Sequence, residues 1–159
     1  GMQLLIENPS ARRRLLAEPA LLPAAVEEMV RLVSPVRTFG RTATQDTELR
    51  GRPIKEGQTV LLVYSSANRD AEQFDDPDTF RIDRDADHLA FGIGTHFCLG
   101  ANLARMEMRV TFEELLRRLP NMEYDGRGPV MKPSALVGSY IAMPVRYTPE
   151  GGDRRRAAG

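Results

Sequence analysis

Cysteine, histidine and tryptophan are scarce in this chain of 159 residues, which has one cysteine, two histidines and no tryptophan. A single cysteine excludes an intrachain disulfide, so we expect a reducing, cytoplasmic environment. Basic and acidic side chains number 22 each, so no net charge attracts nucleic acid or an anionic membrane. No apolar run approaches the ~20 residues of a membrane-spanning helix. Glu7 and several arginines interrupt the N-terminal stretch, so we expect no signal peptide.

What is present is enough sequence for one domain with a substantial core. Hydrophobic residues make up 42% of the chain and charged residues 28%. The patterns predict a mainly helical α+β fold over residues 1–149 and a disordered tail at 150–159. We expect helices at residues 3–6, 10–17, 23–34 and 100–119, an antiparallel sheet within 41–63, an irregular coil at 70–87, and short strands at 122–124, 132–137 and 141–147.

Single residues predict how two of these helices begin and which way the long one faces. Ser10 is placed to cap the second helix, and Pro23 to open the third, which Pro35 ends. Spacings of three and four in the long helix predict an inward stripe of Leu103, Met106 and Val110 and an outward face of Arg105, Glu107, Arg109 and Glu113.

The one cysteine lies in a glycine-rich loop directly before the long helix. Backbone N–H groups and the helix dipole at such a position favour the thiolate form of the side chain. Glycines allow sharp turns and a close approach of a flat ligand. Phe91, at the start of the loop, can shield the sulfur from water, and His96, two residues before the cysteine, can reach an anionic group at the ligand edge. The loop therefore predicts axial thiolate ligation of a haem iron. Its residues are Phe91, Gly92, Gly94, His96, Cys98 and Gly100.

Two other interpretations of Cys98 stay open. The residue also fits a buried structural thiol beside a helix cap. His88, His96 and Cys98 together contain the ligand types of a zinc site. That site lacks a fourth ligand, however, and the single residue between His96 and Cys98 suits tetrahedral binding poorly. We therefore rank haem ligation first.

Beyond the loop, the chain resembles the cytochrome P-450 superfamily, specifically its soluble bacterial type, over residues 2–149. The other matching segments are the family's Glu-x-x-Arg, its meander and the start of its L helix, at residues 28–31, 67–70 with 74–80, and 103–105. The resemblance implies the C-terminal part of the P-450 fold. That part comprises the end of the I helix, the J and K helices, small antiparallel sheets, the meander, the cysteine loop and the long L helix.

The resemblance also implies roles for the cofactor-binding residues. Cys98 would be the axial ligand of a haem b iron, and Arg41 and His96 would bind the haem propionates. His88 would be a further cofactor contact, or else an ordinary loop histidine with a partner in the protein.

A structural network is implied next to the haem site. Glu28 and Arg31 lie three apart on one helix, so their side chains can meet. Arg84 takes the place of the family's meander arginine, which completes this pair. A buried carboxylate between two guanidinium groups is tolerable only when every partner is present. Glu27 competes with Glu28 for Arg31, and a solvated ion pair is the simpler alternative.

The family's activity is monooxygenation of a lipophilic substrate by reductive splitting of dioxygen, with electrons from a ferredoxin-type donor. By resemblance, residues 36–39 and 135–138 would line the substrate pocket. Arg105 and Arg109 would present a basic surface to an acidic donor, or else form an ordinary solvated helix face.

Family members are more than twice this length, and the helix that carries their proton-delivering acid–alcohol pair would precede Met2. Two hypotheses follow. In the first, the chain is the haem-binding proximal half of a P-450 monooxygenase and needs the distal half for activity. In the second, it is a catalytically inactive truncated remnant. Such a remnant folds without haem and covers exposed apolar surface by oligomerising.

Overall fold

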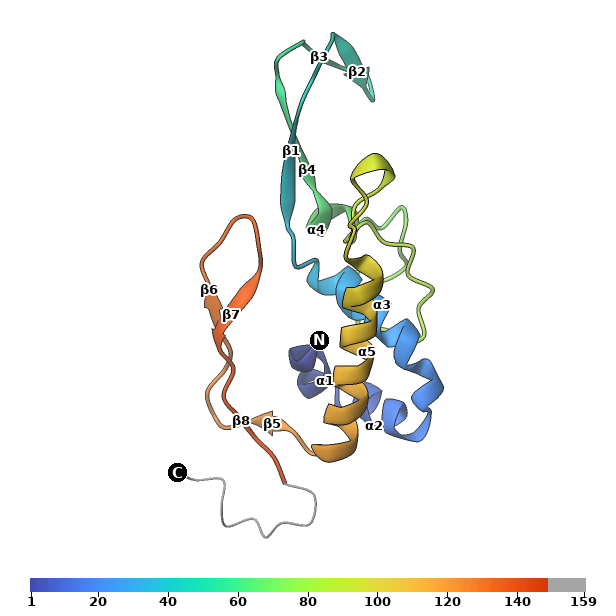
Figure 1. Cartoon of the computed structure of the whole chain (residues 1–159), viewed down its shortest axis with the longest axis vertical. Coiled ribbons are helices and arrows are strands. Elements are labelled where there is room, and N and C mark those ends of the chain that lie inside the picture. The colour runs from blue at the N-terminus through green and yellow to red at the C-terminus, as the bar shows by residue number, and fades with distance from the viewer. Residues whose placement is uncertain (149–159) are drawn as a thin grey trace.

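A computed structural model describes residues 1–148 and places the longer helices at one end of the molecule, with hairpins extending from it (Figure 1). The tail predicted at 150–159 lies outside the described residues. Every predicted helix is present within a few residues of its expected position. The helices are α1 (Met2–Glu7), α2 (Pro9–Ala17), α3 (Leu22–Val33), α4 (Tyr64–Ala67) and α5 (Ala101–Arg118), with 3₁₀ turns η1 (Pro19–Leu21) and η2 (Gly94–His96).

The core lies where α1, α2 and α3 pack against α5 (Figure 1). Helix α3 contributes more of it than any other element, because its apolar side chains recur at spacings of three and four and so share one face. Burying each large apolar side chain contributes about 1.5–3 kcal/mol. The buried core residues are Leu5, Leu15, Leu22, Ala25, Val26, Met29, Ile82, Phe112 and Leu116.

The predicted cap of α2 is wrong. The helix begins at Pro9, before Ser10, and no side chain caps its N-terminus. A proline at the first helical position needs no partner for an N–H group and has its φ angle already set, so the helix starts there. The preceding Asn8 donates instead to the carbonyl of Leu4, at 2.9 Å, and satisfies the end of α1.

The predicted inward stripe of α5 is also wrong. Leu103, Met106 and Val110 are 55%, 49% and 57% exposed. The helix is apolar on two faces, and periodicity alone cannot say which of them meets the core. The face that packs inward carries the buried Ala101, Phe112 and Leu116 and the half-buried Ala104, Arg105 and Met108.

Within residues 1–148, the strands form four separate two-stranded antiparallel sheets. The single sheet predicted within 41–63 is instead two pairs of strands, and its first strand begins three residues earlier than predicted. The strand predicted at 132–137 ends at Lys132. The strand predicted at 141–147 is two strands separated by Pro144. The pairs are β1 (Thr38–Thr42) with β4 (Thr59–Val63), β2 (Thr47–Leu49) with β3 (Arg52–Ile54), β5 (Glu123–Tyr124) with β8 (Val145–Arg146), and β6 (Val130–Lys132) with β7 (Ser139–Ala142).

Between α4 and η2 the chain forms neither helix nor strand, as predicted for residues 70–87. This coil carries the chain from the end of the hairpins to the cysteine loop. None of the helices within residues 1–148 has the length and apolar character that a bilayer crossing requires.

Candidate functional site

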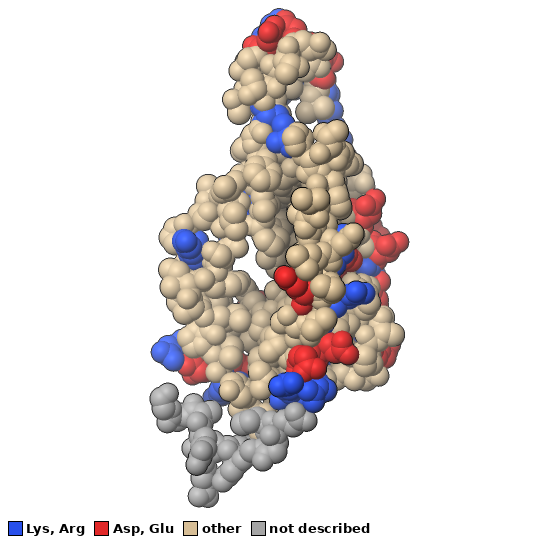
Figure 2. Space-filling view, in the orientation of Figure 1, with Lys and Arg blue, Asp and Glu red and all other residues tan. Residues whose placement is uncertain are grey.

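A hollow of about 640 Å³ opens where the cysteine loop meets the end of α3, strand β1 and helix α5. Its volume falls in the ~300–1,000 Å³ range of ligand pockets. Cys98, His96 and Arg41 line it together with Phe91 and Gly92, so five of the predicted cofactor residues line the same hollow. Figure 2 shows the face beside α5 hollowed and largely free of charged side chains. The apolar lining includes Val30, Pro35, Val36, Phe39, Ala104 and Met108.

The thiol of Cys98 is exposed, so its interpretation as a buried structural thiol is wrong. The loop is held by a hydrogen bond from the Cys98 amide to the Phe91 carbonyl, at 2.8 Å. Gly92 and Gly94 have φ angles of +73° and +68°, which only glycine adopts without strain. These two glycines therefore allow the loop to turn and present the sulfur.

The backbone conformation at Gly100 does not require a glycine. Its φ angle is −87°, which other residues adopt as readily. A Cβ atom at this position would lie 4.0 Å from the Cys98 sulfur. The missing side chain thus keeps the space beside the sulfur open, and no turn depends on it.

His88 turns away from the hollow. Its side chain is 1% exposed, and its Nε2 lies 3.2 Å from a carboxylate oxygen of Glu27. Its Nδ1 accepts the amide of Ala90 at 3.2 Å. Burial lowers the pKa of His88 below its ordinary value, against the opposing pull of Glu27. The structure favours the loop-histidine interpretation over a cofactor contact.

The zinc interpretation is wrong for the same reason. With His88 bound to Glu27, it cannot join His96 and Cys98 around an ion. Across residues 1–148, no three side chains of histidine, cysteine, aspartate or glutamate are grouped to hold a metal.

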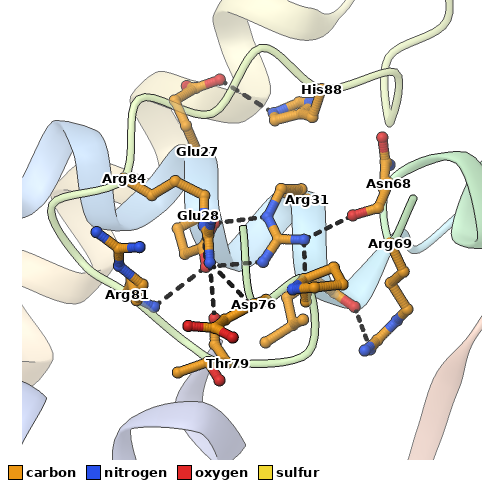
Figure 3. Close-up of polar contacts among 12 residues, drawn as sticks. Glu27, Glu28, Arg31, Asn68, Arg69, Asp76, Thr79, Arg81, Arg84 and His88 are labelled. Carbon is orange, nitrogen blue, oxygen red and sulfur yellow. Dashed lines mark hydrogen bonds and ion pairs between the residues drawn. The ribbon is translucent and has the colours of Figure 1, made fainter. Parts of the chain in front are cut away.

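The structure brings Glu28, Arg31 and Arg84 together in one cluster (Figure 3). Arg31 donates to both carboxylate oxygens of Glu28 at 2.6 and 2.8 Å, and Arg84 adds a third bond at 3.1 Å. Glu28 and Arg31 are fully buried, and Arg84 is 8% exposed. The alternatives of a solvated pair and of Glu27 as the partner of Arg31 are therefore wrong.

The remaining donors of the two arginines bind the irregular coil. Arg31 donates to the carbonyls of Asn68 and Pro77, at 2.6 and 2.8 Å. Arg84 donates to those of Asp75 at 2.7 Å and of two further coil residues. Coil without regular structure leaves backbone carbonyls unpaired, and here buried guanidinium groups satisfy them. The network holds the coil that leads into the cysteine loop.

Two residues that form long-range contacts around the site, Asn68 and Arg105, carry no strong signal in the sequence. Asn68 is fully buried, donates to the Ser34 hydroxyl at 2.8 Å and accepts the Leu89 amide at 2.7 Å. Its place in the segment 67–70 was the only hint. Arg105 donates twice to Glu27, at 2.7 and 2.8 Å, across 78 residues of sequence. No spacing rule could have found that pair.

The pairing changes the interpretation of Arg105 and Arg109. Arg105 was expected on the outward face of α5, but its guanidinium group is held by Glu27 and lies over the Phe91 ring at 4.6 Å. Hydrogen bonding to Glu27 raises the pKa of Arg105 above its ordinary value. Only Arg109 of the two remains exposed.

The two segments predicted to line a substrate pocket lie side by side. Val36 pairs with Val137 in an antiparallel bridge, and the Gly138 amide donates to the Pro35 carbonyl at 2.8 Å. Residues 36–39 and 135–138 are 96 to 102 positions apart in sequence, so only tertiary folding brings the two segments together. Val36 and Phe39 line the hollow, whereas none of residues 135–138 is among its lining residues.

Comparisons with known proteins agree with this geometry. The family model described as Cytochrome P450 matches residues 6–143. The chain is 44% identical over 151 residues to the steroid C26-monooxygenase of Mycolicibacterium smegmatis, covering 94% of this chain and 38% of the relative. It is 46% identical over 145 residues to cytochrome P450-terp of a Pseudomonas species, covering 91% and 34%.

Solved structures give the same result. The crystal structure of CYP109E1 from Bacillus megaterium with testosterone matches with a TM-score of 0.89 and 38% sequence identity, covering 92% of this chain and 41% of that one. The chain therefore spans about two fifths of the length of these relatives. The extent of the match and the identities show that the chain belongs to the cytochrome P450 family.

Proposed function

We propose that this chain is the C-terminal, haem-carrying part of a P450 monooxygenase, with haem b iron bound by Cys98. In this assignment α3 corresponds to the K helix, the coil after α4 to the meander and α5 to the L helix. One observation carries the proposal. The exposed thiol, Arg41 and His96 line the same mostly apolar hollow.

The residues around the hollow fit a haem. A flat apolar macrocycle needs apolar walls, a sulfur that can reach the metal, and cations at the rim for its carboxylates. Apolar side chains of α3, β1 and α5 supply the walls, and Gly100 leaves space beside the Cys98 sulfur. Arg41 and His96 supply hydrogen-bond donors for anionic groups.

In the proposed mechanism the protein holds and tunes the cofactor. Bound haem supplies the reductive activation of dioxygen that monooxygenation requires. Cys98 would provide the thiolate ligand. Phe91, whose carbonyl accepts the Cys98 amide, would limit the contact of the thiolate with water. Arg41 and His96 would hold the haem carboxylates.

P450 enzymes typically take electrons from redox partners and oxidise lipophilic substrates. For this chain we propose a ferredoxin-type donor and a lipophilic substrate near residues 36–39 and 135–138. The apolar character of the hollow and the steroid named for one relative support this substrate class. We further propose that oxidation needs the segments that the relatives have beyond the matched region, supplied by a longer parent or by a second chain.

The test is haem binding followed by the carbon monoxide difference spectrum of the reduced chain. We expect a Soret band at about 450 nm, the signature of thiolate ligation. Cys98→Ala should abolish this band. Arg41→Gln should weaken haem binding roughly tenfold, the effect of losing one charge-assisted hydrogen bond. Arg52→Gln, an exposed arginine on the separate β2/β3 hairpin, is the matched control and should change neither.

The remnant hypothesis predicts a different outcome. A set of large apolar side chains is exposed on α5 and the cysteine loop, including Leu99 at 103%, which fits a chain that self-associates. A folded oligomer that takes up no haem would support the remnant. An unchanged band in Cys98→Ala would reject Cys98 as the ligand.

A further inference from the structure

Glu27 joins three parts of the chain that lie far apart in sequence. It extends from α3, accepts two hydrogen bonds from Arg105 of α5, and lies 3.2 Å from Nε2 of His88 in the coil. Its side chain is 27% exposed and that of Arg105 is 30% exposed, so water competes with these contacts only in part. The Glu27 carboxylate is therefore a fixed acceptor between the helix and the loop.

Both partners of Glu27 contact Phe91. The Arg105 guanidinium lies over the Phe91 ring, 4.6 Å from its centre, in a cation–π contact. The His88 ring lies 5.7 Å from the Phe91 ring, centre to centre. The Phe91 carbonyl in turn accepts the Cys98 amide at 2.8 Å. A continuous series of contacts thus connects Glu27 with the backbone of Cys98.

The charges suit a positioning role. Burial alone would raise the pKa of Glu27, but hydrogen bonding and charge from Arg105, with His88, outweigh it and hold that pKa below its ordinary value. Glu27 is therefore ionised at neutral pH and balances the charge of Arg105. A neutral acceptor could not hold the two donors of the guanidinium fork as firmly.

We propose that Glu27 is the positioning residue of the cysteine loop, because it holds Arg105 and His88 against Phe91 and thereby fixes the backbone at Cys98. The inference rests on the proposed function only for the role assigned to this loop, which is to present the haem ligand. It does not require that the chain binds haem.

Hydrogen exchange in the full chain without haem tests the proposal directly. In Glu27→Gln we expect the Cys98 amide to exchange about tenfold faster, as its loop loses a charge-assisted contact. Amides in the buried middle of α3 should keep their rates. Glu114→Gln is the matched control, because Glu114 also accepts from two arginines but on the exposed side of α5. It should leave the Cys98 amide unchanged.

Two further variants separate positioning from general destabilisation. Arg105→Lys keeps the charge but loses the planar fork and the ring contact, so it should also speed exchange at Cys98. In Phe91→Leu the connecting ring is absent, and adding Glu27→Gln should then have no further effect on Cys98. In the carbon monoxide difference spectrum of the reduced, haem-loaded Glu27→Gln chain, the thiolate band at ~450 nm should be smaller relative to the band of haem ligated by the neutral thiol.

The possible outcomes are decisive. Unchanged exchange at Cys98 in Glu27→Gln overturns the proposal, and so does an equal rise across all core amides. If Glu27→Gln does not fold, Arg105→Lys decides by the same measurement. Failure of the parent chain to bind haem would reject the proposed function and leave the exchange result standing.

Discussion

The two sides of α3 use neighbouring carboxylates in different ways. Glu28 points into the protein, where Arg31 and Arg84 surround it, whereas Glu27 points along the loop side toward His88 (Figure 3). Glu28 is fully buried and Glu27 is about a quarter exposed. One residue along a helix turns a side chain by about 100°. That turn separates a network that holds the coil from one that contacts the cysteine loop.

The comparison teaches how burial sets the importance of an ion pair. A fully buried carboxylate between two guanidinium groups stabilises the fold only as a complete set, and removing one member leaves buried charge without a partner. When the partly exposed Glu27 carboxylate is removed, water can rehydrate its partly exposed partner Arg105, so its loss costs less. The Glu28 side should therefore govern folding, and the Glu27 side local geometry.

The largest expected effect is on the free energy of unfolding of Glu28→Gln. The change leaves two buried arginines without a counter-charge, so we expect a loss of about 3–5 kcal/mol. Glu27→Gln, one residue away, should lose only about 1–2 kcal/mol. Urea denaturation followed by circular dichroism measures both, with the exposed Glu114→Gln as a control near zero. Equal losses for Glu27 and Glu28 would remove the distinction between the two sides.

A middle-sized effect is expected at Asn68, which accepts from Arg31 of the buried network and from the amide of Leu89, the residue after His88. Asn68→Ala leaves the Leu89 amide and the Ser34 hydroxyl without their buried partner, which should cost about 1–3 kcal/mol. The same substitution at the exposed Asn102 of α5 should change stability by less than about 0.5 kcal/mol. Denaturation curves of the two variants measure the difference. A loss at Asn102 as large as that at Asn68 would contradict this assignment.

The smallest effect is a pH dependence on the Glu27 side. Burial lowers the pKa of His88, so as the pH falls its imidazole is protonated in the unfolded chain at a higher pH than in the folded chain. Stability from neutral His88 is complete above its unfolded pKa of about 6.5 and is lost as the pH falls toward the folded value. The lowered pKa of Glu27 affects the stability of the fold only at more acidic pH.

Thermal unfolding of His88→Gln and of the parent chain between pH 7.5 and about 5.5 measures the contribution of His88 to the pH dependence of stability. The variant should lose less stability than the parent over that interval, since other groups titrate in both and cancel in the difference. Identical slopes would show that His88 takes up its proton equally easily in the folded and the unfolded chain.

Several features could be predicted from local sequence because local residues cause them. The helix at Ala101–Arg118, the coil at 70–87 and the cysteine loop each have their cause in a short motif. The association of Glu28, Arg31 and Arg84 came from family resemblance. The bounds of the strands were less accurate, because short hairpins depend on their pairing partners more than on composition.

What the sequence determined by itself is the main helices and the cysteine loop, and from them it predicts the type of chemistry. One cysteine among glycines before a helix already indicates a thiolate ligand. Tertiary structure alone decided which face of α5 is buried, that His88 and Arg105 meet at Glu27, and that Arg41 reaches the same hollow as Cys98. The physical reason is that periodicity shows which residues share a face, whereas packing between distant segments decides what that face meets.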